Sequence, residues 1–419
     1  MTPLPLPDAV DVLVVGARCA GAATARLLAA AGARVLVVDR APAGTDTLST
    51  HALMRGAVVQ LARWGVLPAI VAAGTPAVRR TTFEYAGESV GVDITPKHGV
   101  DALYAPRRTV LDRVLAEAAA AAGADVRHGY RLRTLVRDDA GRVTGAALDD
   151  PQGQAHTVRA ALVVGADGRH STVARQVNAA TIREGRAATA TVYGHFPGIT
   201  ADGYRWLFAE GSSAGVIPTN DGASCVFATV PAPRFAEVFA RDREAGFPQV
   251  LASLDPSLAD ATRAAAPLDG LHGFAGRTGG FTACQGPGWA LVGDAAYFKD
   301  PLTAHGITDA LLHAELLATA ITAGTDAGLA WYEETRTIIG RPVFEITEAI
   351  AAFDWTLAEV RDLHTALARA MSGEIKETLA ALGQAAVDFG VPALHDDQAR
   401  RRQGLGGVLH HEQEPVPVG

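Results

Sequence analysis

The strongest constraint on the fold is a strand–glycine–helix–strand pattern at the start of the chain. The apolar run from Val10 to Val15 ends at Gly16, a helix-forming stretch spans 20–31, and a second apolar run spans 34–39. The whole unit takes about 30 residues, which is the usual length of a βαβ unit. Because both runs are apolar at almost every position, they predict parallel strands of a sheet that is covered on both faces.

The turn inside this pattern, residues 16–21, reads Gly-Ala-Arg-Cys-Ala-Gly and predicts a dinucleotide-binding site. The first glycine allows a tight turn, the last lets the helix approach the strand, and the helix N-terminus offers free N–H groups to a pyrophosphate. Asp39 ends the second strand, where it can accept hydrogen bonds from ribose hydroxyls. Arg18 replaces the middle glycine of the pattern, and it either contacts the phosphates or points away. The predicted cofactor-binding residues of this unit are Gly16, Ala17, Arg18, Ala20, Gly21, Asp39 and Arg40.

Composition excludes several classes of protein. With 419 residues, 48% of them hydrophobic, the chain can bury a large core, and a net charge of -8 without a basic block argues against nucleic acid as a partner. The first residues lack the basic flank and apolar stretch of a signal peptide, and no apolar run is long enough to span a bilayer. The three cysteines are far apart, which gives neither a disulfide framework nor a pair of metal ligands. We therefore expect a cytoplasmic protein without a metal site.

The spacing of apolar residues predicts an α/β protein whose first domain is discontinuous. Helices are expected over 50–67 and 107–122, whereas alternation with a period near two over 188–230 is typical of an antiparallel sheet. After residue 331, apolar residues recur at three- and four-residue steps, which predicts long helices bent or restarted at Pro342. The expected units are a Rossmann-type domain (8–80, 101–180 and 276–330), a mixed or antiparallel-sheet substrate domain (81–100 and 181–275), a helical C-terminal region (331–402) and a flexible tail (403–419).

Two later motifs point to the identity of the cofactor. Residues 165–175 read Gly-Ala-Asp-Gly-Arg-His-Ser-Thr-Val-Ala-Arg, and residues 293–296 read Gly-Asp-Ala-Ala, with Pro301 and Gly306-Ile307 after them. Together with the turn at 16–21, these motifs resemble those of the FAD-dependent oxidoreductases of the para-hydroxybenzoate hydroxylase fold. That group includes the group A flavoprotein monooxygenases and the geranylgeranyl reductases. The resemblance covers residues 8–325.

The resemblance implies FAD as the cofactor and NAD(P)H as a transient electron donor. Arg108 matches a position that touches FAD, although it could instead be a solvated residue at a helix start, and Asp167 could instead form a turn. A helix that begins near Gly306 would direct its positive end at the reduced flavin ring, where negative charge gathers. The FAD-binding residues implied by the later motifs are Arg108, Asp167, Gly168, Gly293, Asp294, Pro301, Gly306 and Ile307.

Three polar residues are candidate catalytic groups beside the flavin. His51 either takes part in catalysis or lies at a helix cap, since Ser49 and Thr50 before it are good N-cap residues. Lys299 either touches flavin or substrate or forms a surface pair with the next residue, an aspartate. His305 either relays a proton near neutral pH or is an ordinary loop histidine.

An aromatic strand is the candidate wall of the substrate pocket. Tyr204, Trp206 and Phe208 alternate along the chain, so they point to one face, where they line a pocket or pack in the core of the sheet. Asn220 carries the same two interpretations.

The predicted function is oxidation–reduction on a hydrophobic small molecule. The first prediction is NAD(P)H-dependent monooxygenation of an aromatic or polycyclic substrate, with molecular oxygen as the second substrate and a flavin hydroperoxide as the oxidant. The alternative is a reductase or dehydrogenase acting on an alkene or saturated ring, since the same scaffold serves both reactions. The third hypothesis is a non-catalytic protein that binds flavin or interacts with a partner. The sequence leaves a monomer or a homodimer open, because the C-terminal helices could cover the pocket or pair with a second copy.

Overall fold

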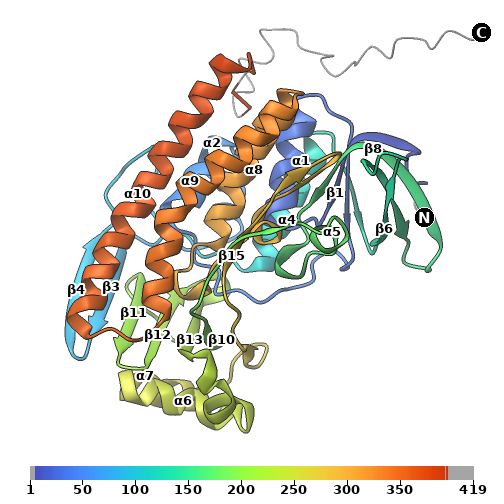
Figure 1. Cartoon of the computed structure of the whole chain (residues 1–419). Helices are drawn as coiled ribbons and strands as arrows, with labels where there is room; N and C mark the ends of the chain where they lie inside the picture. Colours follow the sequence, from blue (N-terminus) through green and yellow to red (C-terminus); the bar gives the residue numbers. More distant parts are fainter. Residues whose placement is uncertain (1–4, 392, 395–419) are drawn as a thin grey trace, which may run out of the picture.

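The computed structural model describes residues 5–391 and 393–394, and its first sheet has the predicted parallel core (Figure 1). The strands pair in the order β17-β8-β1-β2-β5, and each neighbouring pair is parallel. Leu13 and Val14 in the middle of β1 are fully buried, as strands covered on both faces require. The parallel strands are β1 (Ala9–Val15), β2 (Val35–Asp39), β5 (Asp125–His128), β8 (Ala155–Gly165) and β17 (Trp289–Leu291).

Antiparallel strands extend the first sheet beside β8 and beside β17. The first half of β8 pairs with β7 (Val143–Asp149), which pairs in turn with β6 (Arg131–Arg137), and β16 (Gln285–Gly286) pairs with β17. Helix α1 (Cys19–Ala30) follows β1 and contacts both α4 (Arg108–Ala121) and α8 (Gly306–Thr322). The carboxyl ends of β1, β2, β8 and β17 therefore lie at one edge of the sheet.

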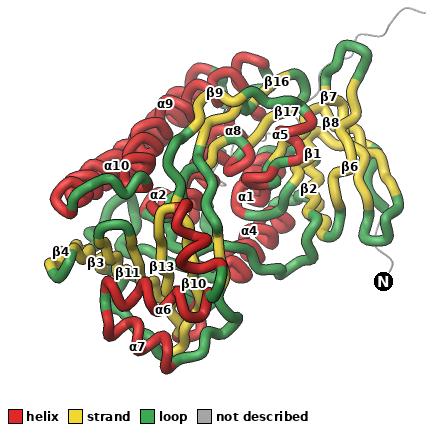
Figure 2. Tube along the Cα trace, turned by 60° about the horizontal axis from the view of Figure 1, so that its bottom comes forward, coloured by secondary structure: helices red, strands yellow, loops and turns green. Residues whose placement is uncertain are grey.

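The second sheet is mostly antiparallel and has its own core. Its order is β14-β10-β13-β12-β11-β3-β4, and only the pair of β11 and β3 is parallel. Helices α6 (Arg243–Leu254) and α7 (Pro256–Ala264) lie against it, away from β6 and β7 (Figure 2). Its strands are β3 (Arg80–Tyr85), β4 (Glu88–Asp93), β10 (Thr189–Pro197), β11 (Tyr204–Ala209), β12 (Ser212–Pro218), β13 (Ala223–Pro231) and β14 (His272–Phe274).

Short elements join the two sheets. A three-stranded sheet between the two larger sheets is formed by strands β9 (Thr181–Glu184), β15 (Gly280–Thr282) and β18 (Tyr297–Phe298). Helix α2 (Arg55–Arg63) is a shorter form of the helix expected over 50–67, and a separate helix, α3 (Leu67–Ala72), begins where that helix was expected to end. Residues 50–54 are not helical, because His51 has a positive φ of 62° and the Leu53 N–H donates to the Tyr104 carbonyl oxygen at 2.9 Å.

The C-terminal region consists of two long helices that pack beside α8 (Figure 1). Helix α9 (Asp326–Ala351) runs through Pro342, so the predicted restart at this proline is wrong. The break comes later, where Phe353 has a positive φ of 55° and a capping box of Thr356 and Glu359 starts α10 (Leu357–Asp388). Within the described residues, no helix is both long and apolar enough to cross a membrane. The tail expected over 403–419 lies outside the described residues, and the proposed domain boundaries stay predictions.

Candidate active site at the junction of the two sheets

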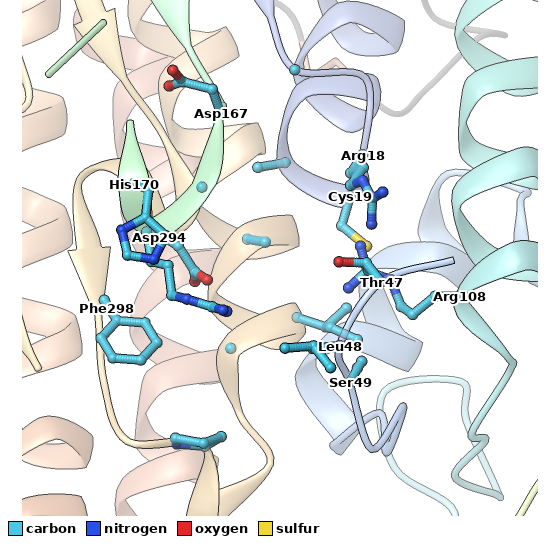
Figure 3. Close-up of a pocket in the computed structure, with 18 of the residues that line it drawn as sticks. Arg18, Cys19, Thr47, Leu48, Ser49, Arg108, Asp167, His170, Asp294 and Phe298 are labelled. Atoms are coloured by element: carbon cyan, nitrogen blue, oxygen red, sulfur yellow. The ribbon is translucent and has the colours of Figure 1, made fainter. Parts of the chain in front are cut away.

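A large cavity lies where the carboxyl edge of the first sheet meets the second sheet. Its volume is about 680 Å³, within the usual range for cofactor and ligand sites. Figure 3 shows two facing walls, with Arg18, Cys19 and Arg108 on one side and Asp167 and Asp294 on the other. All predicted FAD-binding residues except Ala17, Gly21 and Gly293 line this cavity.

The glycine turn after β1 is shaped by close backbone contacts. Gly16 has φ +111°, and a Cβ atom there would lie 2.3 Å from the carbonyl oxygen of Ala166. A Cβ atom at Gly21 would lie 1.8 Å from the carbonyl oxygen of Gly16. Only glycine fits either position, which brings the N-terminus of α1 to the cavity, where its free N–H groups can bind an anion. The Asp39 carboxylate accepts hydrogen bonds from the N–H groups of Ala17 (2.9 Å) and Ala41 (2.8 Å).

Two arginines of this wall share one carboxylate that sequence reasoning missed. Arg108 donates to both oxygens of Asp112 at 2.9 and 3.0 Å, and the Arg18 Nη1 lies 3.9 Å from the same carboxylate. The Cys19 thiol donates to Asp112 as well, at 3.3 Å. The spacing of Arg108 and Asp112 by four helical residues was the available signal. Arg18 bends toward Asp112 and toward the backbone carbonyls of Thr45 and Asp46, at 3.4 Å each, while it still lines the cavity.

Asp167 forms the turn that the sequence analysis allowed as an alternative. Its carboxylate accepts from the Ser171 hydroxyl at 2.5 Å and from the Thr172 N–H at 2.6 Å, and Ser171 is the N-cap of the short helix α5 (Thr172–Gln176). The residue nevertheless borders the cavity, next to Gly168 with its positive φ of 75°.

The Gly293–Asp294 motif supplies a half-buried carboxylate at the opposite wall. Gly293 has φ +63°, and a Cβ atom there would lie 2.8 Å from the Cβ of Ala20 on α1. Burial and the nearby Asp309 carboxylate raise the pKa of Asp294 to about 6. Its Oδ1 lies 3.9 Å from the Cβ position of Gly306, at the N-terminus of α8. A carboxyl group of this kind can accept hydrogen bonds from the hydroxyls of a bound cofactor.

Lys299 and His305 belong to one buried charged cluster. Lys299 is paired with Asp309, and the Nε2 of His305 lies 2.5 Å from Glu374 on α10 and 3.7 Å from Asp309. The expected pair of Lys299 with Asp300 does not form, because Asp300 accepts instead from the N–H and hydroxyl of Thr189. Sequence reasoning missed Glu374, since nothing local links residue 374 to residue 305.

His51 also has a buried partner that the sequence analysis did not identify. Its Nε2 lies 2.6 Å from the Nε2 of His195 on β10. It is not a helix cap, because α2 begins only at Arg55. Strand alternation was the signal that could have found His195, because it points to the same face of β10 as Thr191 and Tyr193, which line the cavity.

The aromatic wall of the cavity differs from the predicted one. Of the four predicted pocket residues, only Trp206 lines the cavity. Tyr204 is buried and donates to the Tyr104 carbonyl oxygen at 2.7 Å, and Phe208 packs against Tyr85, Trp355 and His364. Asn220 holds loops together, since its Oδ1 accepts from the Arg107 N–H at 2.9 Å. The other aromatic residues of the cavity wall are Tyr130, Tyr193, Phe227, Phe274 and Phe298.

These features fit FAD. The three glycines 16, 21 and 293 allow the close packing that brings the α1 N-terminus and Asp294 to the cavity, and the α1 N-terminus and Arg108 suit a pyrophosphate. The carboxylates of Asp39 and Asp294 both line the cavity, where hydroxyl groups of a dinucleotide need acceptors.

Comparison with known proteins agrees with this fit. A profile of the FAD binding domain matches residues 9–347. Menaquinone reductase of Mycolicibacterium smegmatis is 30% identical over 349 residues, which make up 77% of this chain and 79% of that protein. A digeranylgeranylglycerophospholipid reductase of Methanosphaerula palustris is 27% identical over 324 residues, 74% of this chain and 75% of that protein.

Two further similarities come from hydroxylating and halogenating proteins. Aklavinone 12-hydroxylase RdmE of Streptomyces purpurascens is 34% identical over 184 residues, which cover 39% of this chain and 34% of that protein. The solved structure of the flavin-dependent brominase Bmp2 has the same fold, with a TM-score of 0.73 at 17% identity over 91% of this chain and 100% of that one. The chain therefore belongs to the FAD-binding domain family and is a FAD-dependent oxidoreductase.

Proposed function

We propose that this protein is a FAD-dependent reductase that saturates a double bond of a hydrophobic substrate. The main observation behind this proposal is that the aromatic side chains of Trp206 and Phe227 line the same cavity as the glycine turn at Gly16. A substrate held there would lie beside the cofactor and away from water. The proposal is supported by the two reductases that match about three quarters of the chain, whereas the hydroxylase matches much less of it.

Bound FAD would supply the hydride chemistry, with NAD(P)H as the transient electron donor. The chain's own residues bind, orient and shield. The N-terminus of α1 and Arg108 would hold the pyrophosphate, and Asp39 and Asp294 would accept from cofactor hydroxyls. The N-terminus of α8, at Gly306 and Ile307, lines the cavity, where its positive end stabilises negative charge.

Product analysis tests this proposal. The FAD-loaded protein is reduced anaerobically with NADPH or NADH and then mixed with a menaquinone or a digeranylgeranyl lipid, the kinds of molecule named for its reductase relatives. We expect a product in which one carbon–carbon double bond has become a single bond, with a gain of two hydrogen atoms that persists after any hydroquinone has been reoxidised in air. A protein that takes electrons from either nucleotide but never saturates a double bond in such substrates would contradict the proposal.

Monooxygenation is the second candidate, favoured by the similarity to a hydroxylase. The same reaction run in air with isotopically labelled oxygen distinguishes the two. Label in the organic product means hydroxylation, and a saturated product without label means reduction.

A further inference from the structure

A chain of three polar side chains leads from the cavity wall to the surface. His51 lines the cavity and is only 1% exposed, and its Nε2 lies 2.6 Å from the Nε2 of His195. On the far side of His195, Nδ1 lies 3.1 Å from Oδ1 of Asp269. The Asp269 side chain is 30% exposed, so one end of the chain is in the wall and the other is in water.

Asp269 determines which ring nitrogens carry protons. An ionised carboxylate can only accept, so Nδ1 of His195 donates to it and Nε2 of His195 is left as an acceptor. Nε2 of His51 must then donate across the 2.6 Å contact, which leaves Nδ1 of His51 as an acceptor. Among the described residues, this buried nitrogen has no hydrogen-bond partner. A buried acceptor without a partner costs about 1–3 kcal/mol, so a bound hydroxyl group that donates to this nitrogen would remove that cost.

The surroundings keep both rings neutral and the carboxylate charged. Burial, and then the neighbouring His195 and Arg107, lowers the pKa of His51 well below its ordinary value. Burial also lowers the pKa of His195, against the opposing effect of Asp269. Burial opposes the charge on Asp269, but hydrogen bonding to His195 and the charge of Arg107 hold its pKa below the ordinary value. The other titratable groups that face this chain are Asp46, Arg108, Tyr193, Cys225 and His272.

The backbone at His51 is strained, and this conformation positions the His51 ring for its contact with His195. Its φ of 62° lies in the left-handed region, which is uncommon for residues other than glycine. The conformation is held because the His51 N–H donates to the Ser49 hydroxyl at 3.1 Å and the Ser49 N–H donates to the Tyr193 hydroxyl at 3.0 Å. Tyr193 and His195 lie on one face of β10, so the same strand fixes both the strained turn and the partner ring.

A metal site is the competing interpretation of these residues. Ligand atoms of His51, His195 and Cys225 lie within 4.8 Å of one another. Zinc binds histidine nitrogen at about 2.0–2.1 Å, which separates two tetrahedral ligand atoms by about 3.3 Å. The observed separation of 2.6 Å is that of a hydrogen bond, so the geometry favours a shared proton.

We propose that His51, His195 and Asp269 form a proton-transfer chain that takes a proton from a hydroxyl group of the cavity-bound substrate. The substrate O–H bond breaks as an N–H bond forms at Nδ1 of His51. His51 passes its Nε2 proton to Nε2 of His195, which becomes an imidazolium whose Nδ1–H still donates to the Asp269 carboxylate. The substrate gains one negative charge and His195 gains one positive charge, so charge is conserved.

The inference rests on the proposed function of the cavity and narrows its substrate class. In the reverse direction, the loaded chain returns its proton to an oxygen atom that becomes negative when the neighbouring double bond takes up hydride. The substrate is therefore a hydrophobic molecule that carries a carbonyl or hydroxyl oxygen next to the double bond that is saturated.

Nitrogen NMR of the FAD-loaded, ¹⁵N-histidine-labelled protein reads the chain without any substrate. We expect an unprotonated Nδ1 in His51 and a protonated Nδ1 in His195 at neutral pH. Asp269→Ala should change the tautomer of His51, although His51 does not touch residue 269, because the order of protons along the chain is lost. His272→Gln is the matched control, since His272 also faces Asp269, at 3.5 Å, but lies outside the chain, and it should leave His51 unchanged.

The ionisation of a bound phenol tests proton transfer at the cavity end of the chain. With saturating 4-nitrophenol at a pH below its solution pKa, the bound probe should hold a larger phenolate fraction in the wild-type protein than in His51→Gln, by its absorption. Asp269→Asn can keep the hydrogen bond but carries no charge to stabilise the His195 imidazolium. It should therefore lower that fraction toward the His51→Gln value while flavin content stays normal.

Three results would overturn the inference. They are a His51 tautomer that Asp269→Ala does not change, a probe spectrum that stays that of the neutral phenol, and a stoichiometric metal ion bound to His51 and His195 after purification. The NMR arm needs neither turnover nor a known substrate. Its failure is therefore distinguishable from failure of the proposed reductase activity.

Discussion

Two polar clusters border the same cavity, and they differ in whether they reach water. The cluster of Lys299, His305, Asp309 and Glu374 is almost completely buried, and its opposite charges face one another. The chain of His51, His195 and Asp269 is buried at one end only and holds one formal charge, on its exposed aspartate. The closed cluster is suited to hold the cofactor loop and α10 in place, whereas the open chain is suited to move a proton. Burial of charge, more than residue type, separates the two.

The largest expected effect comes from breaking the closed cluster. Lys299→Met removes the partner of Asp309 and leaves a buried carboxylate uncompensated, which typically costs about 3–5 kcal/mol. His195→Gln in the open chain should cost about 1 kcal/mol, since it removes hydrogen bonds between neutral rings and one partly exposed carboxylate. Urea unfolding of the two variants measures the difference. Equal losses would show that burial of charge does not distinguish the clusters.

The next effect concerns the cavity between the clusters. Gly16→Ala should reduce flavin affinity at least about tenfold, because the new Cβ would meet the Ala166 carbonyl at 2.3 Å and displace the turn. Gly123→Ala is the matched control: its φ of +106° is close to the +111° of Gly16, but nothing lies within 4 Å of its Cβ position. The ratio of flavin to protein absorbance after purification reads both variants. Similar flavin losses in the two would mean that backbone strain alone is responsible.

A smaller effect is expected from Asp294, which faces the closed cluster. Its pKa is raised from 3.8 to about 6 in the folded protein, so the folded state holds its proton more tightly than the unfolded state. Stability from this group is thus present at low pH and is lost as pH rises from about 4 to about 6. Asp294→Asn should remove about 2 kcal/mol of the difference in stability between pH 4 and pH 7 in the flavin-free protein.

Thermal unfolding at a series of pH values checks this expectation. Asp300, whose pKa is also raised to about 6, should leave a residual slope of the same sign in the variant. An unchanged pH dependence in Asp294→Asn would mean that its carboxyl group is hydrated in the flavin-free cavity.

The smallest effect on the free energy of unfolding is expected from an exposed salt bridge. Arg113 and Glu117 form a salt bridge of 3.1 Å on α4, four residues apart, with both side chains more than half exposed. Arg113→Ala should change the free energy of unfolding by only about 0.3–0.5 kcal/mol. A loss comparable to that of Lys299→Met would remove the basis of the comparison.

The sequence predicted the parts of the molecule that depend on local pattern. The βαβ unit, the glycine turn and the Gly293–Asp294 motif could be found because a few adjacent residues determine each of them. The fold class and the FAD-binding family are confirmed. The start of α8 at Gly306 and the antiparallel strands around Ala190 and Ala223 also lie where periodicity placed them.

Partners far apart in the sequence were not predictable in this way. Glu374 reaches His305 across 69 positions, and His195 reaches His51 across 144. No period or motif relates such residues, so only the folded arrangement reveals them. Tyr204 and Phe208 show the related limit: alternation places side chains on one face of a strand, but does not tell whether a cavity or a packed core covers that face.

The strand order also has a consequence for how the chain folds during synthesis. The first sheet needs β17, at residues 289–291, to pair with β8, which was made more than a hundred residues earlier. Strands β10 to β13, by contrast, are linked by short turns and pair with near neighbours in the sequence. We therefore expect the second sheet to fold first on the ribosome. The edge of β8 that pairs with β17 stays unpaired until β17 has been synthesised. That exposed edge would be the natural target of a chaperone, and the flavin cavity would be among the last features to form.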